Sequence, residues 1–273
     1  MSTESAAVGA HRLTKSRRAG RELLLEWAFE PLASLLVAVF LRLRVPPPAV
    51  VLGNAAAGVL AAAALVADAL LAAALLLQVK TLLDNADGGL ARVSGRVTLA
   101  GRYLDTTADI VVNALLFLAL AQVTGQPALA VVGFAALTLV LSADFNVTEL
   151  ARAAHGVVVP QPARTGGRAE RLLGRVYAVV FAPQDRLVRA ISARRLEAVA
   201  GPDAPAEVRS AYFDTVTLTA LANLGLTTQL AALGVCLALG LPAVYLWLAV
   251  AAFLTLVPLQ LRRERIVRRA WRP

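Results

Sequence analysis

The sequence predicts an all-α, polytopic membrane protein with six transmembrane helices and an N-terminal interfacial amphipathic helix. Of the 273 residues, 58% are hydrophobic and 16% are charged, and the mean hydropathy is +0.68. A soluble domain averages about 45–50% apolar and about 25% charged residues. The apolar residues form long Leu, Ala and Val runs without the alternation of a membrane β-barrel. The basic residues lie between these runs, as in helical membrane proteins.

Residues 1–48 are interpreted as a cytoplasmic basic tail followed by the interfacial helix. Residues 1–20 are polar and basic, and residues 21–44 combine Trp27 with a short Leu/Val/Phe run and two closing arginines. That run, residues 32–41, is too short to cross about 30 Å of hydrocarbon, so we expect this helix to lie on the membrane surface. Residues 46–48 are prolines, which lack an amide donor and end the helix.

Residues 49–261 form the predicted six-span transmembrane domain. The apolar stretch from residue 49 to residue 79 is too long for one helix and is expected to turn near Asp68. The polar, Arg-rich segment 151–213 is interpreted as a cytoplasmic connection containing an amphipathic surface helix near residues 170–196. Residues 262–273 form a basic cytoplasmic tail. The predicted spans are residues 49–66, 69–93, 98–123, 128–148, 214–239 and 243–261.

The distribution of lysine and arginine predicts the orientation in the membrane. These residues number 7 in 1–48, 4 in 77–104, 10 in 151–213 and 6 in 262–273, which accounts for all 27. The turns near residues 66–69, 124–127 and 240–242 carry none. By the positive-inside rule, we expect both termini of this integral protein of the cell membrane to be cytoplasmic. The net charge of +9 therefore fits topology and contact with anionic lipids, and we expect no nucleic-acid partner.

Four aspartates occur within otherwise apolar sequence at the expected cytoplasmic ends of the second and third spans. Asp84 and Asp87 are three residues apart, and Asp105 and Asp109 are four apart, so each pair shares one face of a helix. Ionisable residues at membrane depth are costly and mark functional sites. Grouped carboxylates repel one another without cations, and oxygen ligands select Mg²⁺, Mn²⁺ or Ca²⁺. One interpretation of the four aspartates is a two-metal site for phosphoryl transfer. The alternative is a transporter that uses the carboxylates for cations or protons.

The spacing of these residues resembles a known family signature. Asp84-x-x-Asp87-Gly88-x-x-Ala91-Arg92, then eight residues, then Gly101-x-x-x-Asp105-x-x-x-Asp109, is similar to the full motif of the CDP-alcohol phosphatidyltransferases. The resemblance implies an enzyme that moves a phosphatidyl or other phospho-alcohol group from a CDP-alcohol to a polar alcohol and releases CMP. It also implies two Mg²⁺ or Mn²⁺ ions held by the four aspartates, with Asp109 as the general base. The positions implied to bind the CDP group are Gly88, Ala91, Arg92 and Gly101, together with Thr98.

The location of the motif at the membrane interface favours CDP-diacylglycerol as donor, and hence a role in phospholipid biosynthesis. A soluble donor such as CDP-inositol stays open within the same family. The sequence departs from the family pattern at Ala49 and Leu52 in the first span, and at Thr106 and Ile110 after the third and fourth aspartates. The departures at Thr106 and Ile110 weaken the expectation that the acceptor is a glycerophosphate. Dimers occur in the family, and no segment here specifies an interface.

Four further polar residues near the motif are candidates for contact with the acceptor or with phosphate. Lys80 either binds a substrate phosphate or extends to the membrane interface, and Arg102 can pair with phosphate. Asn113 either lines the cavity or bridges helices, and Asp144 either holds the acceptor's polar group or ends a helix in solvent. The acceptor itself is not specified by these residues.

Overall fold

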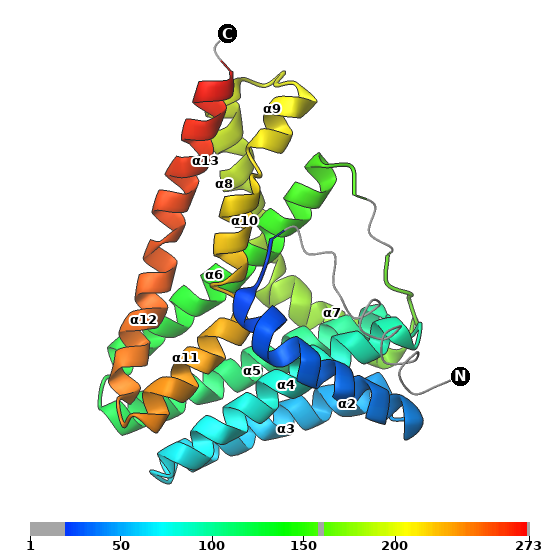
Figure 1. The fold of residues 1–273 in the computed structure, drawn as a ribbon, viewed down its shortest axis with the longest axis vertical. Helices are drawn as coiled ribbons and strands as arrows, with labels where there is room; N and C mark the ends of the chain where they lie inside the picture. Colours follow the sequence, from blue (N-terminus) through cyan, green and yellow to red (C-terminus); the bar gives the residue numbers. More distant parts are fainter. Residues whose placement is uncertain (1–19, 158–160, 272–273) are drawn as a thin grey trace.

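Helices account for most of the computed structural model, which describes residues 20–157 and 161–271 (Figure 1). The predicted basic tail, apart from Gly20, lies outside these residues. Within the described ranges the β-structure is one isolated bridge between Thr98 and Ala163, so the predicted all-α class is confirmed. In chain order the elements are the π-helix η1 (Leu25–Phe29) and the α-helices α2 (Glu30–Arg42), α3 (Pro47–Val66), α4 (Leu70–Val93), α5 (Leu99–Thr124), α6 (Pro127–Ala154), α7 (Arg168–Val180), α8 (Ala182–Ala200), α9 (Ala206–Ala211), α10 (Thr215–Ala222), α11 (Leu226–Ala238), α12 (Pro242–Leu254) and α13 (Leu256–Ala270).

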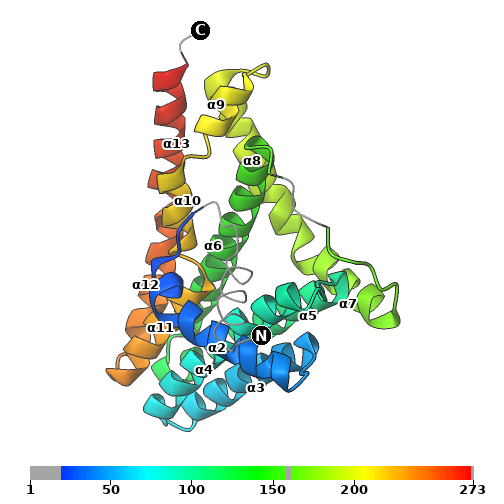
Figure 2. The ribbon, with the colours of Figure 1, turned by 45° about the vertical axis from the view of Figure 1, so that its right-hand side comes forward.

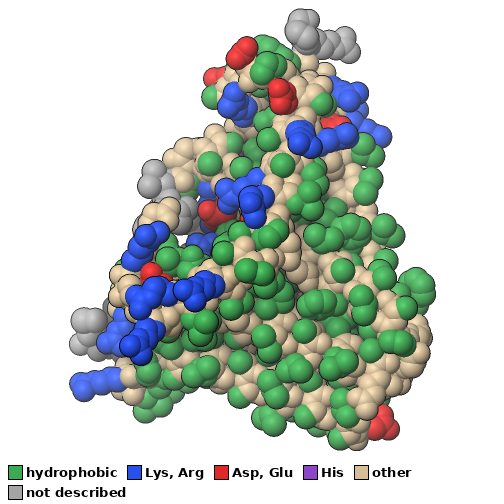
Figure 3. Space-filling model, turned by 180° about the vertical axis from the view of Figure 1, so that it is seen from behind, with side chains coloured by type: hydrophobic (Ala, Val, Ile, Leu, Met, Phe, Trp, Pro, Cys, Tyr) green, Lys and Arg blue, Asp and Glu red, His purple; other side chains and the backbone are tan. Residues whose placement is uncertain are grey.

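Five segments are long and apolar enough to cross a membrane, which supports the polytopic arrangement. They are Pro47–Val66, Leu99–Thr124, Pro127–Ala154, Ala206–Ala238 and Pro242–Ala270. The predicted second span, α4, has 24 residues and so extends for about 36 Å, but its first 18 residues already include Lys80, Asp84 and Asp87. Because of these three charges, α4 is not one of the five apolar segments. The sixth membrane crossing therefore stays a prediction. Figure 3 shows apolar side chains over most of the lower part of one face, with Lys and Arg gathered at its flank and upper end.

A tight hairpin joins α3 to α4 where the sequence predicts a turn. Asp68 adopts the left-handed conformation with φ 58°, which short polar residues tolerate better than most. The two helices meet through small and branched apolar residues, of which Ala61, Leu65, Ala73 and Leu77 are fully buried. α5 packs against α3, so α3, α4 and α5 form one compact layer (Figure 1).

Two predicted helices are interrupted in the structure. The predicted span 214–239 consists of α10 and α11, which are separated at Asn223–Gly225, where the Asn223 side chain bonds to the N-terminal segment. The predicted surface helix near residues 170–196 consists of α7 and α8, which meet at Phe181. Pro183 in the first turn of α8 has no amide hydrogen for a continuous helix, which explains this boundary. Figure 2 shows α7 beside α5 and α8 beside α6, and α8 also packs against α13.

The ends of the transmembrane region also differ from the prediction in one place. The predicted last span ends at residue 261 and a tail follows, whereas α13 continues as a helix to Ala270.

At the N-terminus, η1 and α2 form the predicted helix before the prolines. Ala33 and Val37 of α2 pack on Ala86 and Leu90 of α4, while the Trp27 side chain is 81% exposed. That exposed aromatic fits an interfacial location.

Gly58 permits the close approach of α3 and α5, and its replacement tests this packing. A Cβ at residue 58 would overlap Cγ1 of the buried Val112 and lie 3.2 Å from Cδ of Lys80. Because a β-branched side chain is stiff, we expect Gly58→Ala to lower the free energy of unfolding by about 1–3 kcal/mol. Gly53→Ala on the same helix meets only Leu83 Cδ1 at 4.0 Å and should be neutral or stabilising. Thermal unfolding in detergent measures the stability of both variants. Equal unfolding midpoints for Gly58→Ala and Gly53→Ala would contradict the close packing at Gly58.

Candidate active site

Three of the four predicted metal ligands lie together. Asp84 of α4 and Asp105 and Asp109 of α5 each offer a carboxylate oxygen, and these oxygens lie within 4.8 Å of one another. The loop between α4 and α5 turns at Gly95, whose φ is 67°, and so brings the two helices back side by side. Asp87, one turn along α4, is not in this group. We call Asp84, Asp105 and Asp109 the carboxylate cluster.

Two buried oxygens at the site fit a bound cation. Asp87 is 5% exposed, and its Oδ2 has no hydrogen-bond partner among the described residues. Oδ1 of Asp105 is likewise buried without a partner in that part of the chain. A buried carboxylate oxygen without a donor is unfavourable, and a hard divalent cation would satisfy it. The donor set therefore fits the predicted divalent metal, Mg²⁺ or Mn²⁺.

Lys80 is the positive side chain that lies within the cluster. It is 0% exposed, and its Nζ donates to Oδ1 of Asp109 at 2.7 Å and to Oδ1 of Asn54 at 3.1 Å. The Asn54 amide in turn donates to Oδ1 of Asp84 at 2.9 Å. Lys80 and Asn54 thus join α3, α4 and α5 beneath the carboxylates. The prediction that Lys80 extends to the interface is wrong because it is buried, and its predicted phosphate contact is unsupported because it lines neither cavity described below.

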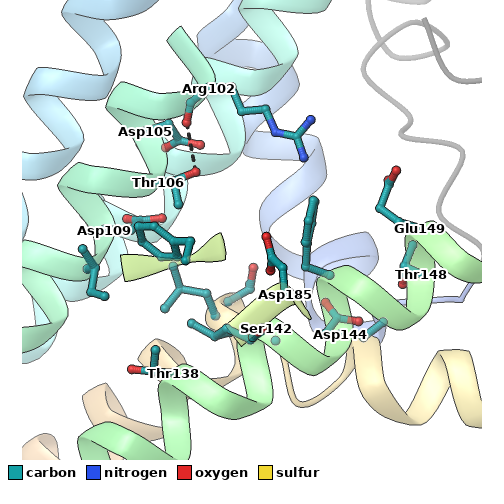
Figure 4. A pocket seen from close by; sticks show the side chains of 18 of the residues that line it. Arg102, Asp105, Thr106, Asp109, Thr138, Ser142, Asp144, Thr148, Glu149 and Asp185 are labelled. Atoms are coloured by element: carbon teal, nitrogen blue, oxygen red, sulfur yellow. Dashed lines mark hydrogen bonds between the residues drawn. The ribbon is translucent and has the colours of Figure 1, made fainter. Parts of the chain in front are cut away.

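The first of two cavities at the cluster has a volume of about 390 Å³. α6 forms much of its wall, so we call it the α6 cavity (Figure 4). Asp84, Asp105 and Asp109 line one side of it. The predicted contacts Arg102, Asn113 and Asp144 also line it, together with Thr138, Ser142, Thr148, Glu149 and Asp185.

The second cavity has a volume of about 580 Å³ and contains the glycines of the motif. We call it the glycine cavity. All residues predicted to bind CDP line it, and so does Asp87; these residues are Gly88, Ala91, Arg92, Thr98 and Gly101. The Thr98 side chain also caps α5 by accepting a hydrogen bond from the Gly101 amide at 3.0 Å. Asp105 and Arg102 line both cavities, so the two cavities meet at the carboxylate cluster.

A polar network that the sequence did not reveal supports the far wall of the α6 cavity. Asp185 of α8 accepts from Nδ2 of Asn146 at 2.6 Å and from the Tyr177 hydroxyl at 2.6 Å. Burial, with help from Asp185, raises the pKa of Tyr177 to about 12, so the phenol stays protonated and donates. Nε of Arg189 donates to Oδ1 of Asn146 at 2.8 Å. The Arg-rich connection, predicted as a cytoplasmic segment with a surface helix, therefore also lines the α6 cavity through Tyr177 and Asp185.

The N-terminal segment closes another side of the α6 cavity, which Gly20 and Glu22 line. The Asn223 side chain accepts from the Leu23 amide at 3.0 Å and donates to the Arg21 carbonyl at 2.7 Å. These bonds fix the segment at the break between α10 and α11. No sequence motif indicates this contact, because its two partners are about 200 residues apart.

The fold and the site define a helical membrane protein with a carboxylate cluster between two cavities. The family model of the CDP-alcohol phosphatidyltransferases matches residues 44–257, so the chain belongs to this family. It is a phosphotransferase enzyme with a CDP-alcohol as donor and an alcohol as acceptor. Comparisons with curated proteins and with solved structures gave no match.

Replacing Lys80 tests whether it balances the carboxylate cluster. Breaking a buried ion pair costs about 3–5 kcal/mol, because the remaining charge stays uncompensated. We expect Lys80→Met to lower the thermal unfolding midpoint in EDTA, and to gain more from Mn²⁺ than the wild type gains, because the ion supplies the missing positive charge.

Arg194→Met is the control, since Arg194 is exposed on α8. Its midpoints should stay within about 2 °C of the wild type with and without metal. An identical response to Mn²⁺ in Lys80→Met and the wild type would contradict the charge-balancing role.

Proposed function

We propose that this enzyme transfers a phosphatidyl group from CDP-diacylglycerol to a polar alcohol in phospholipid biosynthesis. The observation that carries the proposal is the meeting of two cavities at Asp105 and Arg102, beside the carboxylate cluster. A donor in the glycine cavity and an acceptor in the α6 cavity would approach each other there. Such an arrangement fits a direct transfer between two bound substrates.

We assign the glycine cavity to the CDP group. Gly88 and Gly101 leave room for the ligand against the helix backbones, and Arg92, Arg96 and Arg102 supply positive charge for a diphosphate. Pro46–Pro48, at the start of α3, also line this cavity. Leu52 on the next turn of α3 is 58% exposed on the apolar surface, which suits acyl chains that remain in the bilayer. CDP-inositol remains the soluble alternative.

We assign the metal site to Asp84, Asp87, Asp105 and Asp109, with two Mg²⁺ or Mn²⁺ ions as the proposed complement. Bound ions of this kind neutralise a diphosphate and stabilise its leaving oxygen. Their fit rests on the partnerless oxygens of Asp87 and Asp105 described above. The protein's own contribution is to hold these carboxylates in a fixed arrangement through Lys80 and Asn54.

In the proposed reaction, the acceptor hydroxyl oxygen attacks the donor phosphorus that carries the lipid alcohol. A new phosphorus–oxygen bond forms, and the bond to the bridging diphosphate oxygen breaks. The electron pair of that bond leaves with CMP. Asp109, which lines the α6 cavity, takes the hydroxyl proton as general base. Lys80 holds Oδ1 of Asp109 and so orients this carboxylate.

We propose that both termini and the active site are cytoplasmic, because all lysines and arginines lie in the segments assigned to that side. A transporter that uses the same carboxylates is disfavoured. That alternative predicts carboxylates on broken helices, whereas the carboxylates here lie on the continuous helices α4 and α5. The broken pair α10 and α11 lines the α6 cavity without supplying a carboxylate to the cluster.

Asp109→Asn tests the assignment of the general base. Because an amide cannot take the proton, we expect CMP release from CDP-diacylglycerol to fall by about 10²–10⁴-fold, with Mn²⁺-dependent binding of CDP largely retained. Asp203→Asn, in an exposed turn, should keep wild-type turnover. Released CMP is measured with Mn²⁺ and a panel of acceptors. Wild-type turnover in Asp109→Asn would remove Asp109 as base.

A further inference from the structure

We propose that the α6 cavity selects an acceptor alcohol without an anionic group, that is, a neutral polyol or an amino alcohol, and rejects phosphorylated alcohols. This inference rests on the proposed function, which places the acceptor in this cavity. It adds the chemical class of the acceptor, which family membership leaves open. The charges, the hydrogen-bond acceptors and the size of the cavity support it in turn.

The cavity wall is acidic beyond the carboxylate cluster. Its further acidic side chains are Glu22, Asp144, Glu149 and Asp185, and its basic side chains are Arg102 and Arg152. Acidic groups therefore outnumber basic ones in this wall without the cluster, whose charge Lys80 and the proposed metals offset. A phosphate ester brought into this cavity would meet like charge on several sides, whereas an ammonium group would meet opposite charge.

The contacts of these groups leave the charge imbalance in place. Nη1 of Arg152 lies 2.7 Å from Oε1 of Glu149, so the charges of this pair offset each other and neither contributes to the imbalance. Arg102 also lines the glycine cavity, where a diphosphate would compete for its charge. Asp185, in contrast, receives its two hydrogen bonds from an amide and a phenol, which carry no charge. Its negative charge therefore acts on the cavity without direct neutralisation by those partners.

Two amide oxygens at the cavity need hydrogen-bond donors. Asn113 is 5% exposed, and its Oδ1 has no partner among the described residues. Oε1 of Gln184 is also buried without a partner in those ranges, while its Nε2 donates to the Val180 carbonyl at 3.0 Å. A hydroxyl or an ammonium group can donate to both oxygens, whereas an ionised phosphate only accepts. Asn113 follows Asp109 by one turn, so a donor bound there lies near the proposed base.

The dimensions of the cavity suit a small head group. Its volume of about 390 Å³ lies at the lower end of the range for small-molecule sites, about 300–1,000 Å³. Figure 4 shows Asp109, Ser142, Asp144 and Asp185 around one space, so the polar groups come from α5, α6 and α8. A compact polyol or amino alcohol could contact these walls at once.

Matched acceptors test the inference in the full-length enzyme with Mn²⁺ and CDP-diacylglycerol in detergent. One set is glycerol, 2-amino-1,3-propanediol and glycerol 3-phosphate, and a second is myo-inositol and its monophosphate. We expect CMP release with an unphosphorylated member at a kcat/KM at least about 10-fold above that of its phosphorylated partner. A phosphorylated acceptor used equally well or better would overturn the inference while leaving the transferase intact. CMP release with neither class would contradict the proposed function itself.

Asp185→Asn provides the second measurement, because it removes one charge with little change in size. The preference for the unphosphorylated partner should shrink several-fold, and Asp203→Asn should leave the preference unchanged. If Asp185→Asn fails to fold because its network is disturbed, Asp144→Asn tests the same charge from α6. An unchanged preference in the folded variant would contradict the electrostatic selection.

Discussion

Three carboxylates of α4 and α5 come within 4.8 Å of one another in a bundle whose other contacts are mostly apolar. Like charges at this distance repel strongly where water is scarce, so the site depends on positive charge held nearby. Lys80 supplies one such charge from within α4, and Asn54 of α3 joins it to Asp84. α3 must therefore lie close to both α4 and α5. Gly58, which faces Val112 and the Lys80 stem, makes that approach possible.

The remaining helices surround this cluster and leave two cavities beside it. α4 and α5 form the glycine cavity with the start of α3, whereas α5, α6 and the surface helices form the α6 cavity. The network of Asn146, Tyr177 and Asp185 anchors α7 and α8 to α6, so the basic connection becomes a wall of the enzyme. In the proposed mechanism this separation lets donor and acceptor meet only at Asp105 and Arg102.

Local features of the chain were predictable from the sequence, and long-range ones were not. The turn at Asp68 depends on neighbouring residues, and so does the helical phasing that brings Asp105 and Asp109 to one face beside Asp84; the sequence predicts both. Asn54 and Lys80 are 26 residues apart and meet only because α3 and α4 pack in one register. The Asp185 network and the contact of Asn223 with Leu23 depend on tertiary packing that no motif records. One of the two predictions for Lys80, extension to the membrane interface, is wrong because the sequence alone does not show that α3 and α5 cover this side chain.

The central claim is that divalent metals occupy the carboxylate cluster between a nucleotide in the glycine cavity and an acceptor in the α6 cavity. A structure with Mn²⁺ and CDP-diacylglycerol, in which the metal is located by its anomalous scattering, tests this claim most directly. We predict metal at about 2.1 Å from oxygens of Asp84, Asp105 and Asp109, with cytidine beside Gly88 and Gly101. Metal bound away from these carboxylates, or cytidine in the α6 cavity, would contradict it.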